Sequence, residues 1–139
     1  MPPRRSPRLG FLSLVLFAAA VSLAAPQDNA AAHFNRGNAL SDKGDLDGAI
    51  AEYRKALRLR PNYFDAHYLL GNALYAKGDE GAIAEFREVL RLQPDYPEAH
   101  YNLGIALATR GNNDEAAREF TEAQRLNPKL KPPADKPPQ

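Results

Sequence analysis

The feature that most constrains this chain is a motif that recurs every 33 to 34 residues. The segments HFNRGNAL (33–40), HYLLGNAL (67–74) and HYNLGIAL (100–107) share a His-aromatic start, a glycine and a closing Ala-Leu. A period of this length indicates stacked supersecondary units, each burying its apolar face against its neighbours. The same shift aligns Gly44, Gly78 and Gly111; Ala49, Ala82 and Ala116; Tyr53, Phe86 and Phe120; and Pro61, Pro94 and Pro128.

Each unit has the signals of two helices. The first helix is expected to end at a glycine in the left-handed conformation, and a polar cap should then start the second helix. Asn62 and Asp95, each followed three residues later by an acid, resemble capping boxes, and Pro97 sits early in its helix. The second unit is one residue shorter than the first, within a turn. The terminating glycines are Gly44, Gly78 and Gly111, and the caps of the second helices are Asp45, Asp79 and Asn113.

Three further glycines, Gly37, Gly71 and Gly104, fall inside helical patterns. Glycine costs about 1 kcal/mol relative to alanine in a helix interior, so something must offset that cost. We expect a close approach of two antiparallel helices, with small residues and one aromatic ring per unit filling the contact. The histidines that open the motif are expected to be packing residues.

The spacing of these small, aromatic and proline positions resembles the tetratricopeptide repeat, in three copies over residues 30–128. The resemblance implies an all-α protein, an α-solenoid of three helix-turn-helix repeats (30–63, 64–96 and 97–128) that forms a right-handed superhelix. It also implies a concave face, lined by the first helix of each repeat, that binds peptides or partner proteins. The chain departs from the family where His33, His67 and His100 replace Trp and where Leu40, Leu74 and Leu107 replace Tyr.

The residues outside the repeats predict an N-terminal targeting segment and a C-terminal tail. Basic residues precede an uncharged, partly apolar stretch (9–26) that ends in small residues, which is the layout of a secretory signal peptide. We predict cleavage after Ala24, a linker at 25–29, and an exported chain that is periplasmic or secreted. The alternative is an uncleaved anchor, because a helix over 9–25 would span roughly 25 Å. The proline-rich residues 129–139 are expected to be extended or disordered and could themselves be a ligand.

Composition excludes several function classes. The formal net charge of +1 gives nucleic acid no electrostatic attraction, and the absence of cysteine removes thiolate chemistry and disulfides. The three histidines recur once per repeat and should lie more than ~10 Å apart, too far for one metal ion. No nucleophile triad or phosphate-binding loop is present. We therefore expect no enzyme activity, no cofactor and no metal.

The concave face is the expected site. By position in the family, an aromatic stripe and a set of asparagines should contact an extended peptide, the rings by stacking and the amides by hydrogen bonding to its backbone. Two acids in the groove favour a neutral or basic segment. The expected peptide-binding residues are Phe34, Asn38, Asp65, Tyr68, Asn72, Tyr75, Glu98, Tyr101, Asn102 and Ile105.

Two hypotheses about function follow. The first is an adaptor or chaperone-like module that captures a peptide or partner subunit. The second is a structural scaffold that self-associates through the repeat edges, although Arg36 at one edge and Ala117 and Gln124 at the other replace the apolar residues of the inner repeats. The carboxylate clamp of tetratricopeptide co-chaperones is not reproduced, because its positions hold Phe34, Asn38, Leu69, Glu98 and Asn102, of which Asn38 alone fits.

Overall fold

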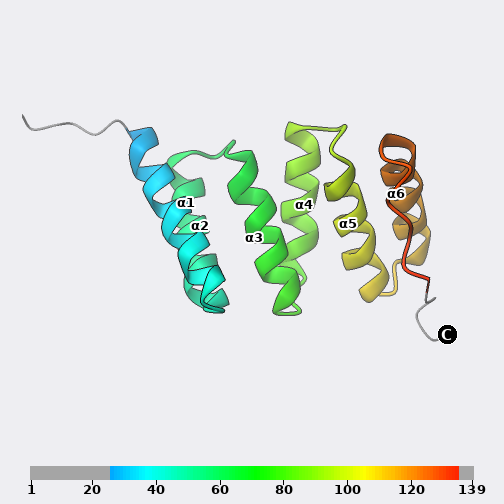
Figure 1. The fold of residues 1–139 in the computed structure, drawn as a ribbon, viewed down its shortest axis with the longest axis horizontal. Helices are drawn as coiled ribbons and strands as arrows, with labels where there is room; N and C mark the ends of the chain where they lie inside the picture. The colour runs from blue at the N-terminus through cyan, green and yellow to red at the C-terminus, as the bar shows by residue number, and fades with distance from the viewer. Residues whose placement is uncertain (1–25, 135–139) are drawn as a thin grey trace, which may run out of the picture.

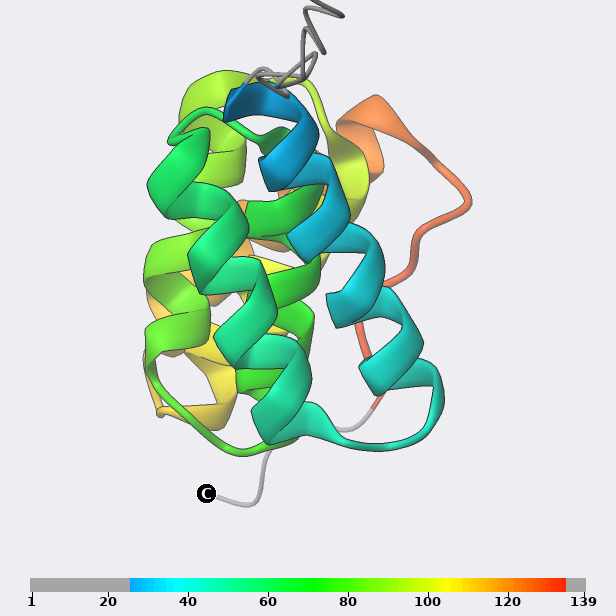
Figure 2. The ribbon, with the colours of Figure 1, turned by 90° about the vertical axis from the view of Figure 1, so that its left-hand side faces the viewer.

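The computed structural model describes residues 26–134, which form three antiparallel helix pairs side by side (Figure 1). Viewed along this array, α1 lies beside α2 and the later helices stack behind them (Figure 2). No strand occurs in this range, which confirms the all-α solenoid. The helices are α1 (Pro26–Asp42), α2 (Leu46–Leu59), α3 (Phe64–Ala76), α4 (Gly81–Leu92), α5 (Pro97–Thr109) and α6 (Asn113–Leu126).

The turn within each pair is closed by a glycine, as predicted. Gly44, Gly78 and Gly111 have φ of 80°, 73° and 79°, a region that side chains rarely adopt. In the first pair the Gly44 amide donates to the Ser41 carbonyl and the Asp45 amide donates to the Leu40 carbonyl, both at 2.9 Å. These two bonds form the Schellman motif and satisfy carbonyls that the helix leaves unpaired.

The predicted caps of the second helices are right in part. Asp45 caps α2 by accepting a hydrogen bond from the Gly48 amide at 2.9 Å. Asp79 accepts from the Gly81 amide at 2.8 Å, although the residue preceding α4 is Glu80. Asn113 was predicted wrongly as a cap, because it is the first residue of α6 and Asn112 precedes it.

The predicted capping boxes are wrong, because α3 and α5 begin after Tyr63 and Tyr96 rather than after Asn62 and Asp95. Pro97 occupies the first helical turn as expected, and a residue before proline favours extended backbone, so Tyr96 cannot be helical. Asn62 instead accepts a hydrogen bond from Arg91 of α4.

The ends of the chain fall partly outside the described residues. At the N-terminal side, α1 already begins at Pro26, within the predicted linker 25–29, and the predicted signal peptide 1–24 lies outside the described range. Residues 131–134 contain no helix, and residues 135–139 of the predicted tail lie outside the described range. Within residues 26–134, no helix is both long enough and apolar enough to cross a membrane.

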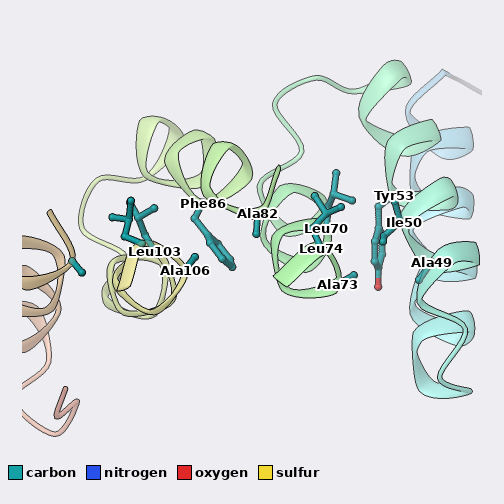
Figure 3. Close-up of a cluster of buried hydrophobic side chains, with 12 residues drawn as sticks. Ala49, Ile50, Tyr53, Leu70, Ala73, Leu74, Ala82, Phe86, Leu103 and Ala106 are labelled. Carbon is teal, nitrogen blue, oxygen red and sulfur yellow. The ribbon is translucent and has the colours of Figure 1, made fainter. Parts of the chain in front are cut away.

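The helix-interior glycines accommodate the aromatic rings of the partner helices, as predicted. A Cβ on Gly71 would lie 2.7 Å from Cε1 of Phe86, and one on Gly37 would lie 2.6 Å from Cε1 of Tyr53. A Cβ on Gly104 would likewise lie 2.8 Å from Cε1 of Phe120. Side chains from α2 to α5 continue this packing from one pair to the next (Figure 3). The buried rings thus hold each pair together and fix the spacing of the first helices.

Candidate functional site

The three residues of the predicted aromatic stripe, Phe34, Tyr68 and Tyr101, lie on the first helices, and their rings are half-buried. Each of these rings packs against the aromatic ring on the second helix of its own repeat. Ring centroids are 6.0 Å apart for Phe34 and Tyr53, and 6.3 Å apart for Tyr68 and Phe86. Tyr101 and Phe120 form the third pair, at 5.6 Å. These contacts anchor the rings, so the stripe is preorganised rather than free to swing.

Two tyrosines that the sequence analysis missed complete this surface. Tyr63 packs its ring 4.9 Å from that of Phe34, and Tyr96 packs edge-on to Tyr68 at 5.3 Å. Both precede the first helix of the next repeat, two residues after the proline that ends the previous one. Their identical offset within the repeat was the signal available in the sequence.

Three of the predicted asparagines take part in side-chain hydrogen bonds, but not in one continuous set. Asn38 accepts from the Tyr53 hydroxyl at 2.8 Å within the first repeat. Asn102 of α5 donates its Nδ2 to Oδ1 of Asn72 at 3.0 Å and to the Tyr68 hydroxyl at 3.1 Å, both on α3. The second and third repeats are therefore joined by an amide network, whereas Asn38 serves its own repeat.

A pocket of about 140 Å³ lies between α3 and α5, beside this network. Its walls are Asn72, Tyr75, Asn102 and Ile105, all four predicted, and the ring of Phe86 also lines it. Within the described residues no hydrogen bond uses Nδ2 of Asn72 or Oδ1 of Asn102. One amide donor and one amide acceptor are therefore available next to an aromatic ring, which suits the N–H and C=O groups of an extended peptide.

The two predicted acids, Asp65 and Glu98, both act on Tyr96, the residue that precedes α5. Burial raises the pKa of the Tyr96 hydroxyl, and the neighbouring Tyr68, Glu98 and Asp65 raise it further. Asp65 is exposed and Glu98 is half-buried. The first turns of α3 and α5 therefore each carry one acid on this part of the face.

The predicted residues of the first repeat lie away from this pocket. Phe34 and Asn38 face Tyr53 and Tyr63 of their own pair and its following loop, and neither lines the pocket. Tyr101 likewise contacts Phe120 and is not among the lining residues. The structure thus brings together the residues of the second and third repeats, whereas the sequence alone placed all three on an equal footing.

The three repeated histidines tie the two helices of each pair together. Nδ1 of each lies 2.6 Å from a carboxylate oxygen of the second helix. Nε2 of His67 lies 2.7 Å from the carbonyl oxygen of Pro61, which ends the preceding repeat. Both oxygens can only accept, so His67 makes both bonds as the imidazolium. The pairs are His33 with Glu52, His67 with Glu85, and His100 with Glu119.

The electrostatics agree with this geometry. Burial alone would lower the pKa of His67, but the hydrogen bonds to Glu85 and to the Pro61 carbonyl outweigh it and raise that pKa. Hydrogen bonds from His33 and Lys55 lower the pKa of Glu52 to about 2. Within residues 26–134, no three His, Cys, Asp or Glu side chains are grouped to hold a metal ion.

Comparison with solved structures finds the same fold in proteins of diverse origin. MamA matches with a TM-score of 0.70 and 27% identity over 74% of this chain and 61% of its own, so this chain spans about three fifths of that protein. The first TPR of Spaghetti (RPAP3), bound to the HSP90 peptide SRMEEVD, matches with a TM-score of 0.71 and 20% identity, covering 75% and 83%. YrrB, described as a TPR protein with an unusual peptide-binding site, matches with a TM-score of 0.69 and 24% identity. The match covers 73% of this chain and 53% of YrrB.

Family profiles cover most of the described region. The profile described as TPR repeat matches residues 37–78, and the one described as Tetratricopeptide repeat matches residues 80–130. No curated protein matches the sequence. The two profiles together span the turn of the first hairpin and the whole of the other two, and the chain therefore belongs to the tetratricopeptide repeat family.

Proposed function

We propose that this protein is a non-enzymatic interaction module that binds an extended peptide segment of another protein between its second and third repeats. The observation that carries the proposal is the pocket between α3 and α5, where Asn72 and Asn102 keep one donor and one acceptor unused. A peptide backbone offers matching groups in pairs, and the rings of Tyr75 and Phe86 that line the pocket give it apolar surface at low entropic cost.

The structural neighbours support a role in peptide binding. One was solved with an HSP90 peptide bound and another is described by its peptide-binding site. Repeats of this family are generally interaction modules rather than enzymes. At identities of 20% and 24% these neighbours support the fold, and the choice of partner rests on this chain's own residues.

The charge of the site favours a neutral or basic segment over an acidic one. The HSP90 peptide SRMEEVD ends in acidic residues. Here Asp65 and Glu98 lie in the first turns of α3 and α5, the two helices between which the pocket lies, and Glu98 stands at a clamp position, where the co-chaperones need a basic residue. Like charges in a site of reduced dielectric repel, so an acidic terminus would bind poorly.

A selection from a random displayed peptide library, with the purified full chain as bait, tests this proposal. Asn72→Ala and Asn102→Ala should each lower the affinity for the selected peptides by about tenfold. Each substitution removes hydrogen bonding to the peptide worth roughly 1.4 kcal/mol in total. Asn35→Ala is the matched control, since Asn35 holds the position of Asn102 in the first repeat and is exposed. If the selected peptides bound all three variants equally well, their binding site would lie outside this pocket. A selection that enriched no peptide would refute the proposal.

The alternative function is a scaffold that self-associates through its edges. The side chains at those edges support it less well. Arg36, whose side chain is 62% exposed, occupies the N-terminal edge where the inner repeats carry Leu70 and Leu103. Ala117 at the C-terminal edge is exposed. Sedimentation equilibrium over a wide concentration range separates the two functions, because a scaffold must associate without any peptide.

We further propose that the chain is exported, with cleavage after Ala24. The support is the order of basic, apolar and small residues in the leader. Mass spectrometry of the chain recovered from its native compartment measures the new N-terminus. Replacing Ala24 with leucine should leave a longer chain on the membrane if this site is used, whereas an unprocessed wild-type chain would favour the anchored alternative.

A further inference from the structure

The second repeat lacks the first turn of its second helix. α4 begins one residue before Ala82, whereas α2 begins three residues before the equivalent Ala49. In the first repeat that turn carries Leu46, whose half-buried side chain packs against the core. The one-residue deletion leaves the second repeat without a counterpart to Leu46, so the space beside the following helix is not filled by an apolar side chain.

An open pocket of about 450 Å³ lies at this point. Ile83 and Ala106 supply apolar surface, and Tyr75 supplies the wall on the side of the groove. Tyr75 is one of two large apolar side chains that are substantially exposed in the described residues, at 40%. It also lines the smaller pocket between α3 and α5. The two pockets therefore meet at one ring, and a ligand in the groove could extend past it.

The edge of the molecule that holds this pocket is acidic. All three within-pair turns lie at this edge (Figure 1). Its basic side chains, Lys43, Lys77 and Arg110, are outnumbered by carboxylates, although Lys77 pairs with Asp47 and Arg87 of α4 pairs with Glu115. The carboxylates are Asp42, Asp45, Asp47, Asp79, Glu80, Asp114 and Glu115.

Within the pocket the basic residue is engaged, whereas each acid keeps part of its carboxylate accessible or unused. Arg110 donates Nη2 to the Gly78 carbonyl at 2.6 Å, and its Nη1 lies 3.8 Å from Glu80. Glu80 has a side chain that is 82% exposed. Asp79 uses Oδ1 to accept from the Gly81 amide, which leaves Oδ2 without a hydrogen bond in the described residues. The mouth of the pocket thus offers two carboxylates beside an exposed aromatic ring.

We propose that this pocket binds a lysine or arginine side chain of the same partner peptide, an inference that rests on the proposed function. The aliphatic stem lies along Tyr75 and Ile83, and the cationic head reaches Asp79 and Glu80. Long basic side chains combine an apolar stem with a charged tip, and a cation is attracted to the face of a tyrosine ring. An acidic or short side chain gains neither contact.

The probe is the tightest peptide from the displayed library, resynthesised with each arginine or lysine in turn replaced by citrulline or norleucine. Citrulline keeps the length of arginine, norleucine keeps the aliphatic stem of lysine, and both remove the charge. At one position the neutral peptide should bind wild-type protein about tenfold more weakly, since hydrogen bonds to charged groups are the strong ones. The double variant Asp79→Asn with Glu80→Gln should bind the charged and neutral peptides within about twofold of each other.

A matched control removes the same charge elsewhere on the acidic edge. Asp42→Asn with Asp45→Asn changes the first repeat, and asparagine at position 45 still caps α2. This variant should keep the full preference for the charged peptide. An equal loss in both double variants would show general attraction by the edge and overturn the pocket. Library peptides that bind through Asn72 and Asn102 but carry no preferred basic position would also overturn it and leave the proposed function intact.

Discussion

Gly71→Ala tests whether a close approach of helices, rather than backbone freedom, explains the glycine inside each first helix. In an exposed helix interior this change would stabilise the protein by about 1 kcal/mol. Here the new Cβ would lie 2.7, 3.0 and 3.1 Å from three ring atoms of Phe86, against ordinary carbon contacts of 3.5–4.0 Å. Phe86 is 1% exposed, so its ring cannot move aside into solvent.

The expected result is a net loss of stability. Overpacking a tight core costs about 1–3 kcal/mol, and a cost of about 2 kcal/mol less the helix-propensity gain leaves about 1 kcal/mol of destabilisation. Urea unfolding followed by circular dichroism should show a lower midpoint with an unchanged slope. Ala84→Gly, at an exposed position within α4, measures the intrinsic difference between the two residues in this protein.

A double-mutant cycle with Phe86→Leu makes the test specific. Leucine removes the ring atoms that meet the new methyl group, so alanine at position 71 should cost nothing or stabilise in that background. The coupling free energy is expected to be about 1–2 kcal/mol. Two results would refute this reasoning. One is that Gly71→Ala stabilises the wild-type chain by as much as Ala84→Gly destabilises it, and the other is that the two free-energy changes of the cycle are additive. Either result would mean that the close approach of the helices does not explain the glycine.

Three further outcomes follow from the polar contacts. Tyr53→Phe should cost about 1 kcal/mol in urea unfolding, because it removes the hydrogen bond to Asn38 while keeping the ring; no loss would mean that the bond contributes nothing net. The raised pKa of His67 stabilises the fold below pH 6.5, and this contribution is lost as pH rises through the folded-state value. The stability advantage over His67→Gln should therefore shrink above that pH, and an advantage that grows would contradict the imidazolium. The lowered pKa of Glu52, about 2, acts oppositely, so the advantage over Glu52→Gln should be present above pH 4.5 and disappear as pH falls toward 2; a constant advantage would refute the pair with His33.

Local chemistry explains why much of the fold could be predicted from the sequence. A glycine two to four residues past the last apolar position of a helix can adopt the positive φ that lets the chain reverse, so Gly44, Gly78 and Gly111 mark the turns. The helix-interior glycines pointed to buried rings because their propensity cost demands a compensating contact. Each of these inferences depends on residues within one hairpin.

The starts of α3 and α5 were harder to predict, because two residues competed for the same role. Asn62 and Asp95 have the side chains that usually cap helices. Their neighbours Tyr63 and Tyr96 instead take the position, since packing of each ring against the preceding repeat outweighs one side-chain hydrogen bond. Packing between repeats is a tertiary effect that local preferences do not contain.

By itself the sequence determined the all-α class, the number of hairpins, the turn glycines and the side of the molecule on which a ligand would be sought. Only the tertiary structure decided which of the predicted residues act together. It joined Asn72 to Asn102 across two repeats and placed Phe34 against Tyr63 and Asn38 against Tyr53. The reason is physical: a repeat fixes which residues share a position, whereas the hydrogen bonds and pockets between repeats depend on the residues that differ from one copy to the next.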